Sequence, residues 1–586
     1  MARNKFDIDE EIDPGFNPHY VKRLLGYLKP YGRELAIAMT LMLVASLAAL
    51  ASPFIIKIAI DTYMPAKDTR GLLMLAGILL LALLVVWLCQ TKRIRIMARI
   101  SQEVIVTIRS DIFAKLQSLP FTYFDSRPQG KVLIRVVNYV NSLSDLLSNG
   151  IIQLVADLFS IILILVLMFI IDVRLTFICM AGLPVLFGAI FMMKRKQHKS
   201  WQNVSRKQAN LNAYLSESLN GMKITQSFAR EYENKKIFSR LGQDWKDAWI
   251  PAVMANFAIW PIIDSLSTIG VCMVYLAGIM WFRDAVTVGT LVAFAGYIWR
   301  FWTPIQNIGN FYNGIVTTGA YMERIFETID EPVSVEDVSG AVCLPAIRGH
   351  VAFENVNFSY DKGHLILKDV NFVISPGMSV AIVGPTGAGK TTIVNLLSRF
   401  YNPDSGAVLI DGIDLRKVTI GSVRAQVGVM LQDSFLFTGT IRDNIRYGKL
   451  DATDEEVERA AKAVHAHGFI MQNANGYDTA VNERGTSLSM GQRQLISFAR
   501  VLLADPRILI LDEATSSVDT ETERAIQAGL VALMRRRTSF IIAHRLSTIR
   551  NSDIIFYIDH GRILESGTHD ELKAAGGPYS ELYRSR

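Results

Sequence analysis

Residues 384–392 have the types and spacing of a phosphate-binding loop. They read G-P-T-G-A-G-K-T-T and match the pattern G-x-x-x-x-G-K-[ST]. Glycines allow a tight turn whose backbone N–H groups point at phosphate oxygens, Lys390 adds a positive charge, and Thr391 offers a hydroxyl to Mg²⁺. The alternative is an ordinary glycine-rich turn. We assign to the nucleotide Gly384, Pro385, Thr386, Gly387, Ala388, Gly389, Lys390, Thr391 and Thr392.

Such a loop needs a strand before it and a helix after it. Residues 379–383 form an apolar run typical of a strand, and residues 393–397 have a helical pattern. Further along, residues 507–511 are typical of a parallel strand buried on both faces, and Asp512 and Glu513 follow them. We expect Asp512 to hold Mg²⁺ through water and Glu513 to polarise an attacking water.

Three more segments complete a set of motifs. Gln432 lies between the phosphate loop and the signature L-S-M-G-Q at residues 488–492, S-S-V-D at 516–519 follows the carboxylates, and His544 follows another apolar run. Taken singly, His544 would be interpreted as a packed or solvated histidine, and Gln432 would be interpreted as a surface side chain. In this order and spacing, the set resembles the nucleotide-binding domain of ABC transporters over residues 340–586.

The resemblance implies a role for each motif. Tyr360 would stack on adenine, with an ordinary strand tyrosine as the alternative. His544 would contact the γ-phosphate and help hold the water that Glu513 activates as general base. The residues around Mg²⁺ would be Thr391, Gln432 and Asp512. The signature and the segment after the carboxylates add further nucleotide contacts, with the signature serving the ATP of a second subunit: Ser489, Gly491, Gln492 and Asp519.

The chain is unusually apolar for a soluble protein, since 50% of its 586 residues are hydrophobic and only 20% are charged. The apolar residues gather in six charge-poor stretches, each long enough or nearly so to cross the hydrocarbon core of a bilayer. They are residues 34–60, 71–90, 147–171, 175–193, 251–282 and 287–318. We therefore expect an α-helical polytopic membrane domain with six transmembrane helices, followed by an α/β P-loop ATPase domain. The expected bounds are 1–325 for the membrane domain, 326–348 for a linker and 349–586 for the ATPase.

Basic residues predict the orientation. Residues 91–145 carry nine Lys or Arg and residues 194–250 carry twelve, whereas the three short connections carry four between them. Cytoplasmic loops are enriched in Lys and Arg, so both long loops, the N-terminus and the ATPase should face the cytoplasm. These loops explain the net charge of +7, and we expect no nucleic-acid partner. We expect no cleavable signal peptide, and residues 21–28 predict an amphipathic helix on the inner membrane face.

The two long loops resemble those of six-helix ABC exporters, in which a short transverse helix in each loop docks on an ATPase domain. We place the first at residues 121–125, F-T-Y-F-D, and the second at 227–231, S-F-A-R-E. Their aromatic residues would fill a groove on the ATPase, and Asp125, Arg230 and Glu231 would supply polar contacts. A plain helical hairpin with local packing is the alternative.

One phosphate loop and one signature make half of two composite sites, so the resemblance implies a dimer with ATP bound between two chains. The third signature position, where the family has glycine, is Met490. A homodimer could tolerate this bulk, with both sites active. Alternatively, this chain is the catalytic half of a heterodimer whose partner lacks the glutamate of its Walker B motif. The wider sequence resembles the catalytic subunit of heterodimeric bacterial multidrug exporters, and we favour that interpretation.

The sixth apolar stretch is rich in aromatic and amide side chains, and three ionisable residues lie within or near predicted spans. These are Asp157, Asp264 and Arg300. Ionisable residues at such depths usually face a bundle interior or a water-filled cavity. They would bind a cationic amphiphile or pair with one another, and internal pairing is slightly favoured. We group them with Trp299 and Trp302 as candidate substrate residues, and core packing is the alternative for each tryptophan.

We therefore expect ATP-driven export of amphiphilic drugs across a bacterial cytoplasmic membrane, with ATP and Mg²⁺ as cofactors. A lipid or glycolipid flippase acting as a homodimer is the main alternative, but it would need basic residues along the cavity. An ATP-gated channel or regulator would add regulatory segments, and a peptide exporter would carry a preceding protease domain. An importer usually carries its spans and its ATPase on separate chains.

Overall fold

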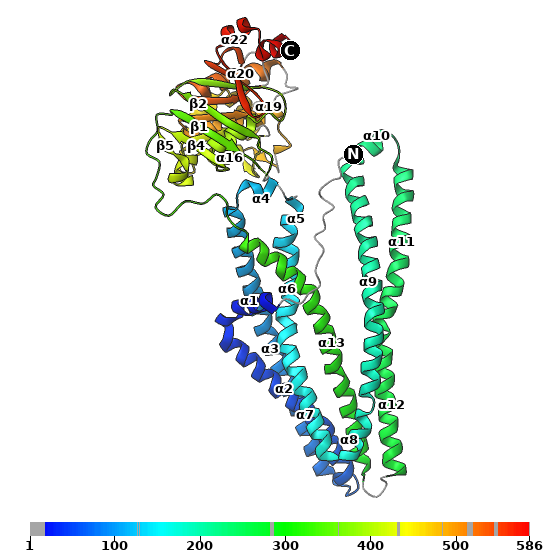
Figure 1. Cartoon of the computed structure of the whole chain (residues 1–586). Helices are drawn as coiled ribbons and strands as arrows, with labels where there is room; N and C mark the ends of the chain where they lie inside the picture. Colours follow the sequence, from blue (N-terminus) through cyan, green and yellow to red (C-terminus); the bar gives the residue numbers. More distant parts are fainter. Residues whose placement is uncertain are drawn as a thin grey trace. The chain divides into compact units, whose positions relative to one another are not determined.

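The chain forms two compact units (Figure 1). The first comprises Met1–Lys115 and Gly130–Asp330, and the second comprises Leu116–Gln129 and Glu331–Arg586. The computed structural model describes residues 18–125, 127, 129–281, 286–360, 363–430, 434–482, 485–512, 520–543 and 549–584. A short segment from the first half of the chain therefore belongs to the second unit.

The first unit is helical, as expected for stretches rich in Leu, Ala, Ile and Met. Its helices are α1 (Pro18–Leu28), α2 (Gly32–Ile58), α3 (Thr69–Ser118), α5 (Gln129–Ile134), α6 (Val140–Asp145), α7 (Ile151–Ile171), α8 (Val173–Met180), α9 (Leu183–Asn220), α10 (Met222–Ser227), α11 (Glu231–Phe257), α12 (Ile259–Met280) and α13 (Val288–Asp330). Among the described residues, π-helical segments interrupt this series at η3 (Ala59–Tyr63), η4 (Arg135–Tyr139) and η5 (Leu146–Gly150).

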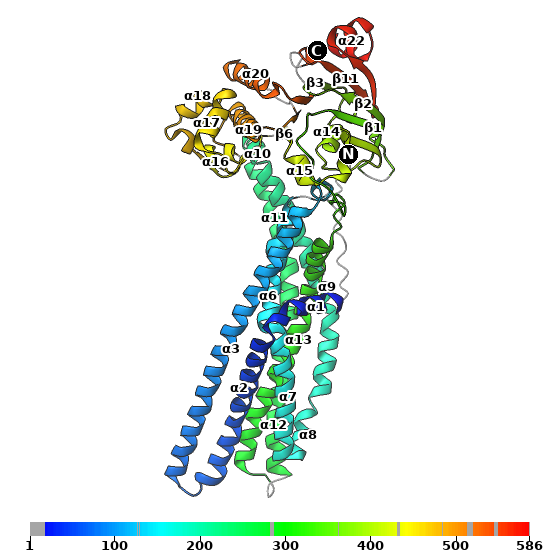
Figure 2. The same ribbon diagram turned by 90° about the vertical axis from the view of Figure 1, so that its left-hand side faces the viewer.

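Several of these helices are much longer than a bilayer core (Figure 2). α3 has 50 residues and α13 has 43, or about 75 and 65 Å of helix, against roughly 30 Å of hydrocarbon. α9 and α11 form a long antiparallel hairpin. The long helices therefore continue beyond the membrane, as the length of the two basic loops predicts.

Within the described residues, four helices are long and apolar enough to cross a membrane. They are His19–Tyr63, Thr69–Ser118, Gln153–Ile171 and Pro261–Met280. The predicted span at 175–193 is divided between α8 and α9, and the one at 287–318 lies in α13, whose amide side chains and arginine make it less apolar. The most apolar part of α3 is almost entirely exposed on this chain, as expected of a helix that faces lipid.

The core of the first unit lies between α7, α8, α12 and α13. Phe294, Tyr297, Ile298 and Phe301 of α13 are buried there, together with Leu50 of α2. The hydroxyl of Tyr297 donates to the backbone oxygen of Leu50 over 3.0 Å. Most of the aromatic residues that make α13 distinctive are thus packed inside the helical unit.

The amphipathic N-terminal helix, α1, is held on the ends of α3 and α13. Its Arg23 lies 4.3 Å from the ring centroid of Phe326 and pairs with Asp330, the last residue of α13. The Tyr27 hydroxyl donates to Asp111 of α3 over 2.8 Å. α1 therefore fixes the point at which the chain leaves the helical unit.

In its described residues, the second unit contains three sheets. A six-stranded sheet has the order β12 (Arg562–Gly567), β11 (Ile554–Asp559), β3 (Ser379–Val383), β10 (Thr538–Ile542), β9 (Ile508–Asp512) and β6 (Val427–Met430). All neighbours in it are parallel except β12 with β11. An antiparallel sheet has the order β2 (Leu367–Ile374), β1 (Val351–Phe358), β4 (Ser405–Ile410) and β5 (Ile413–Asp414). The third sheet pairs β7 (Gly439–Thr440) with β8 (Ala480–Val481).

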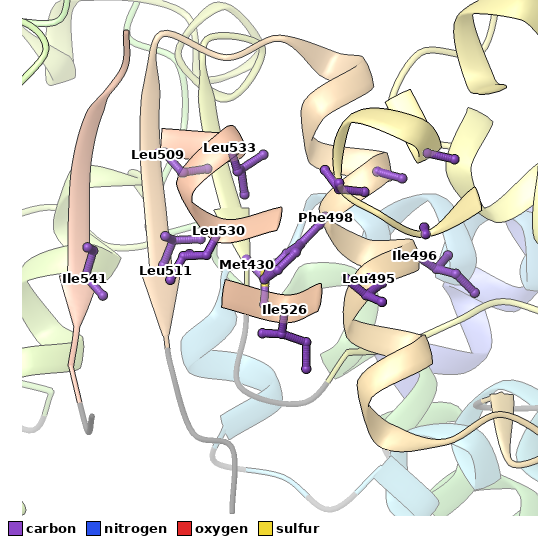
Figure 3. Close-up of a cluster of buried hydrophobic side chains, with 14 of the residues drawn as sticks. Met430, Leu495, Ile496, Phe498, Leu509, Leu511, Ile526, Leu530, Leu533 and Ile541 are labelled. Atoms are coloured by element: carbon purple, nitrogen blue, oxygen red, sulfur yellow. The ribbon is translucent and has the colours of Figure 1, made fainter. Parts of the chain in front are cut away.

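The second unit also contains helices. In chain order they are α4 (Phe121–Asp125), α14 (Lys390–Leu397), α15 (Ile420–Arg424), α16 (Ile441–Arg446), α17 (Asp454–Ala463), α18 (His467–Gln472), α19 (Met490–Ala504), α20 (Thr520–Met534), α22 (His569–Ala575) and α23 (Pro578–Arg584). β9 is buried on both faces, as its continuous apolar run predicts. Leu509 and Leu511 pack toward α19 and α20 (Figure 3), while Ile508 and Ile510 join the cluster on the other face. This packing holds the carboxyl end of β9 rigidly in the sheet.

The first predicted transverse helix is present as α4, and it belongs to the second unit. The second prediction is misplaced. The short helix of that loop is α10, which ends at Ser227, and residues 228–230 form a turn before α11. The turn is enforced at Ala229, whose φ of 50° lies in the left-handed region and cannot continue a helix.

Candidate functional site

The predicted phosphate loop connects β3 to α14, as the sequence pattern requires. Gly384 has a φ of 145°, and a Cβ on it would lie 2.0 Å from the backbone oxygen of Ile558. Gly389 has a φ of 108°, and a Cβ there would lie 2.8 Å from Leu367. Glycine is therefore required at both positions by backbone conformation and by close approach.

The loop presents donors and positive charge. The Lys390 ammonium donates to the backbone oxygens of Gly384 and Pro385 over 2.9 and 2.8 Å, so it lies across the loop. α14 begins at Lys390, and its N-cap, Gly389, has no side chain to satisfy the first N–H groups of the helix. Thr391 is exposed, whereas Ala388 and Thr392 are buried. These features make an anion site.

Asp512 lies at the same edge of the sheet as the phosphate loop. Strand β10 joins them, because Ile542 is paired with Ile382 of β3 on one side and with Asp512 of β9 on the other. Two strand spacings put the backbone of Asp512 about 10 Å from that of Ile382. A carboxylate and the hydroxyl of Thr391 at one edge of a parallel sheet are oxygen donors of the type that Mg²⁺ prefers.

Four predicted residues lie outside the part of the chain that the structure describes: Gln432, Glu513, Asp519 and His544. Their described chain neighbours end the parallel strands. Met430 is the last residue of β6, Asp512 of β9, and Ala543 follows β10. Ligands of parallel α/β sheets bind at the carboxyl ends of the strands.

The signature residues begin a helix. Ser489 is the N-cap of α19 and forms a capping box with Gln492: its side chain accepts the Gln492 N–H over 3.2 Å, and the Gln492 side chain accepts the Ser489 N–H over 3.0 Å. Gly491 is buried. Met490, the first residue of α19, is 37% exposed, so the residue that departs from the family pattern lies at the surface of this chain.

Tyr360 lies beside the phosphate loop, as its predicted role requires. Its hydroxyl donates to Thr392 and accepts from the Asn395 amide, each over 3.3 Å. Its ring meets those of Phe358 and Tyr401 edge-on, with centroids 4.9 and 5.1 Å apart. The side chain is 42% exposed, which leaves ring surface available for stacking.

The sequence motifs do not point to Asn395 or Tyr401. Asn395 lies three residues after Thr392, on the same face of α14, so helical spacing could have found it. Tyr401 has no such signal, because its partners are Tyr360 and Asp125 of α4, far away in the sequence.

Within the described residues, Asp157 and Arg300 form hydrogen bonds with other groups than each other. Asp157 is buried, and its Oδ1 accepts from the amides of Gln153 and Asn307 over 2.9 and 3.4 Å. Arg300 donates instead to the backbone oxygen of Ala49 in α2. The opposite charge that acts on Asp157 is that of Arg93 in α3, while amides and a backbone carbonyl supply the hydrogen bonds of Asp157 and Arg300.

The remaining substrate candidates differ in exposure. Asp264 of α12 is exposed on this chain. Trp299 is 50% exposed, whereas Trp302 is buried in the core of the helical unit. The packing alternative therefore holds for Trp302, and Trp299 and Asp264 are open to a lipid, a substrate or a second subunit.

Comparison with known proteins identifies two family regions in the chain. Residues 35–304 match the family described as the ABC transporter transmembrane region, and residues 367–516 match the ABC transporter family. The chain is 40% identical over 589 residues to the ABC transporter ATP-binding protein YknV of Bacillus subtilis, covering 100% of this chain and 98% of that protein.

Two further relatives have names that include a substrate. A fatty acid ABC transporter ATP-binding/permease protein of Mycobacterium bovis is 38% identical, over 89% of this chain and 82% of its own. An ATP-dependent lipid A-core flippase of Syntrophus aciditrophicus is 34% identical, over 96% and 94%. The solved structure of a bacterial Atm1-family ABC exporter with ATP bound is similar over 94% of this chain and 98% of that one, with a TM-score of 0.80 and 31% identity.

ABC exporters act as dimers in a lipid bilayer and use ATP with Mg²⁺. A helical membrane domain and an ATPase domain follow one another here in a single polypeptide, with the phosphate loop, the carboxylate strand and the signature in the family's order. The chain therefore belongs to the ABC transporter family, as an exporter half-transporter whose ATPase drives transport across the membrane.

Proposed function

We propose that this chain exports hydrophobic and amphiphilic compounds, drugs among them, from the bacterial cytoplasm. The observation that carries the proposal is a helical unit with a buried carboxylate, Asp157, whose Oδ2 has no hydrogen-bond partner in the described structure. A membrane-embedded acidic group of this kind is rare and usually functional. Fatty acid and lipid A, named for two relatives, are both amphiphiles, which supports an apolar-tailed substrate.

For ATP hydrolysis we propose the roles that the family resemblance implies. Tyr360 stacks on adenine, and Lys390 with the N–H groups at the start of α14 binds the phosphates. Thr391, Gln432 and Asp512 hold Mg²⁺, which would neutralise charge that develops on the phosphate oxygens. Glu513 accepts a proton from the attacking water, and His544 helps to hold that water.

We further propose that the second subunit is a different chain with a degenerate Walker B motif. Ser489 and Gly491 of this chain would cap the partner's ATP, and the exposed Met490 would lie at that subunit interface. The test is the ATPase activity of the purified chain alone. Cooperative, drug-stimulated turnover by the lone chain would refute the heterodimer.

The substrate proposal is tested with dyes of different charge. We expect Asp157→Asn to lower export of cationic dyes more than that of neutral dyes in inverted membrane vesicles, because the amide removes a negative charge but keeps the shape. Asp264→Asn is measured in parallel. Equal losses for both classes of dye would show that the carboxylates act only in packing.

The two relatives named above also favour a second candidate, a lipid or glycolipid flippase acting as a homodimer. It predicts that fatty acids or lipids, rather than drugs, stimulate the ATPase in proteoliposomes. Arg300, the basic residue of α13 within the predicted span, is engaged with the Ala49 oxygen, which leaves it poorly placed for an anionic headgroup.

A further inference from the structure

Tyr401 of the ATPase unit contacts both α4 and Tyr360, which are far apart in the sequence. It lies four residues after the end of α14 and is 5% exposed. Its hydroxyl donates to the Oδ2 atom of Asp125, the last residue of the transverse helix α4, over 2.5 Å. Tyr401 is therefore a direct link between the ATPase core and the segment that comes from the membrane half of the chain.

The other side of the Tyr401 ring faces the proposed adenine site. Its centroid lies 5.1 Å from that of Tyr360, and the two rings are at 86°. Phe358 meets both tyrosine rings edge-on, with centroids 5.5 Å from Tyr401 and 4.9 Å from Tyr360. The three rings pack edge to face at angles of 87°, 86° and 68°, which leaves them little freedom, so a displacement of Tyr360 must be taken up by Tyr401.

α4 makes a second contact next to its hydrogen bond with Tyr401. The ring of Phe121 lies 4.6 Å from that of Phe400, and the Arg424 guanidinium lies 5.1 Å from the Phe400 centroid. Phe400 and Tyr401 are neighbours in the chain, so both ends of α4, Phe121 and Asp125, are held by one dipeptide. The apolar contact can slide, whereas the hydrogen bond sets the position and direction of the helix.

The chemistry of this hydrogen bond is well defined. Burial raises the pKa of Tyr401, and its hydrogen bond to Asp125 raises it further. The hydroxyl therefore keeps its proton and remains the donor at physiological pH. Asp125 itself is exposed, so movement of α4 can break the bond without stranding a buried charge.

We propose that Tyr401 is a positioning residue that transmits occupancy of the adenine site to α4. The inference rests on the proposed stacking of adenine on Tyr360. A base on Tyr360 immobilises that ring, the edge-on contact immobilises Tyr401, and the hydroxyl of Tyr401 then fixes Asp125. Because ATP and ADP carry the same base, α4 is held in both nucleotide states and is released when nucleotide leaves.

The experiment measures amide hydrogen exchange in residues 121–125 of the full-length chain in lipid nanodiscs, with and without ADP and Mg²⁺. We expect ADP to slow exchange in α4 of the parent chain. Tyr401→Phe keeps the ring but loses the donor, and should reduce this ADP-dependent protection by about tenfold, the usual loss for a hydrogen bond to a charged group. Asp125→Asn keeps an acceptor oxygen but loses its charge, and should retain part of the protection.

The matched control is Tyr477→Phe. Tyr477 is also a buried tyrosine of this unit, with its hydroxyl 2.8 Å from the His467 ring, and it contacts neither Tyr360 nor α4 in the described structure. This variant should leave α4 exchange at the parental level. A comparable loss of protection in Tyr477→Phe would mean that any buried hydroxyl matters, and would overturn the specific role of Tyr401.

Two further outcomes are distinguishable. Tyr360→Ala should raise the KM for ATP. If Tyr360→Ala raises the KM but Tyr401→Phe keeps the parental protection of α4, the proposed transmission through Tyr401 is wrong, whereas the assignment of Tyr360 to adenine is retained. If Tyr360→Ala leaves the KM unchanged, the adenine assignment fails and the inference fails with it.

Discussion

Replacement of Arg399 by Met should destabilise the ATPase unit strongly. The Arg399 side chain is only 1% exposed, and its guanidinium donates to the backbone oxygens of Val418 and Glu336. It also approaches the Asp337 carboxylate at 3.5 Å. Arg399 thus ties the segment that enters the second unit to the end of α14.

The magnitude follows from what the substitution leaves behind. A methionine side chain has a similar length but no hydrogen-bond donor. The backbone oxygen of Val418, a residue that is 0% exposed, therefore loses its partner, which costs about 1–3 kcal/mol of folding stability. The Glu336 contact adds about 1 kcal/mol, and Asp337 adds little because it is 43% exposed and can turn to water. Burial lowers the pKa of Arg399, so removing the cation returns some desolvation free energy. We expect a net loss of about 2–3 kcal/mol.

The assay is thermal unfolding of the full-length chain in detergent. Unfolding of the ATPase unit is monitored through the loss of its ATP-dependent fluorescence change. A loss of that size corresponds to a fall in the midpoint of roughly 5–10 °C for a unit of this size. The control is Lys462→Met, which removes a pair with Glu458 in which the two side chains are 53% and 40% exposed, and should shift the midpoint by less than about 2 °C. A shift in Arg399→Met no larger than the control would refute this account of the buried arginine.

Three further predictions concern the site and its surroundings. Glu513→Gln should still bind ATP, measured by filter binding, but hydrolyse it at least about a hundredfold more slowly, because the general base is lost; parental turnover would show that another group accepts the proton. Lys390→Ala should weaken ATP binding itself by about tenfold or more, which a titration of bound nucleotide would detect. Burial alone would raise the pKa of Asp414, but hydrogen bonds from Arg416 lower it below its usual value. Its stabilisation is therefore present at neutral pH and lost in acid, so the midpoint of Asp414→Asn should lie below the parental one at pH 7 and converge with it as the pH falls below about 4, through the lowered pKa of Asp414; a gap independent of pH would contradict this.

The ATP site could largely be predicted from local patterns. The strand, the turn and the helix around Lys390 are contiguous, and each obeys a rule that acts within a few residues. The same is true of β9, whose apolar run ends at Asp512. The position of the short helix in the second basic loop was not predictable, because it depends on the left-handed backbone of Ala229, a residue with no such preference.

The sequence by itself determined that a membrane-spanning helical domain precedes an ATPase, because hydrophobic length and phosphate-loop chemistry are properties of continuous segments. Tertiary structure alone decided the partners of the polar groups. Arg300 donates to Ala49, 251 residues away, and Tyr401 to Asp125, 276 residues away. A hydrogen bond requires two groups to meet within about 3 Å, and only the packing of whole helices and sheets brings residues so distant along the chain to that separation.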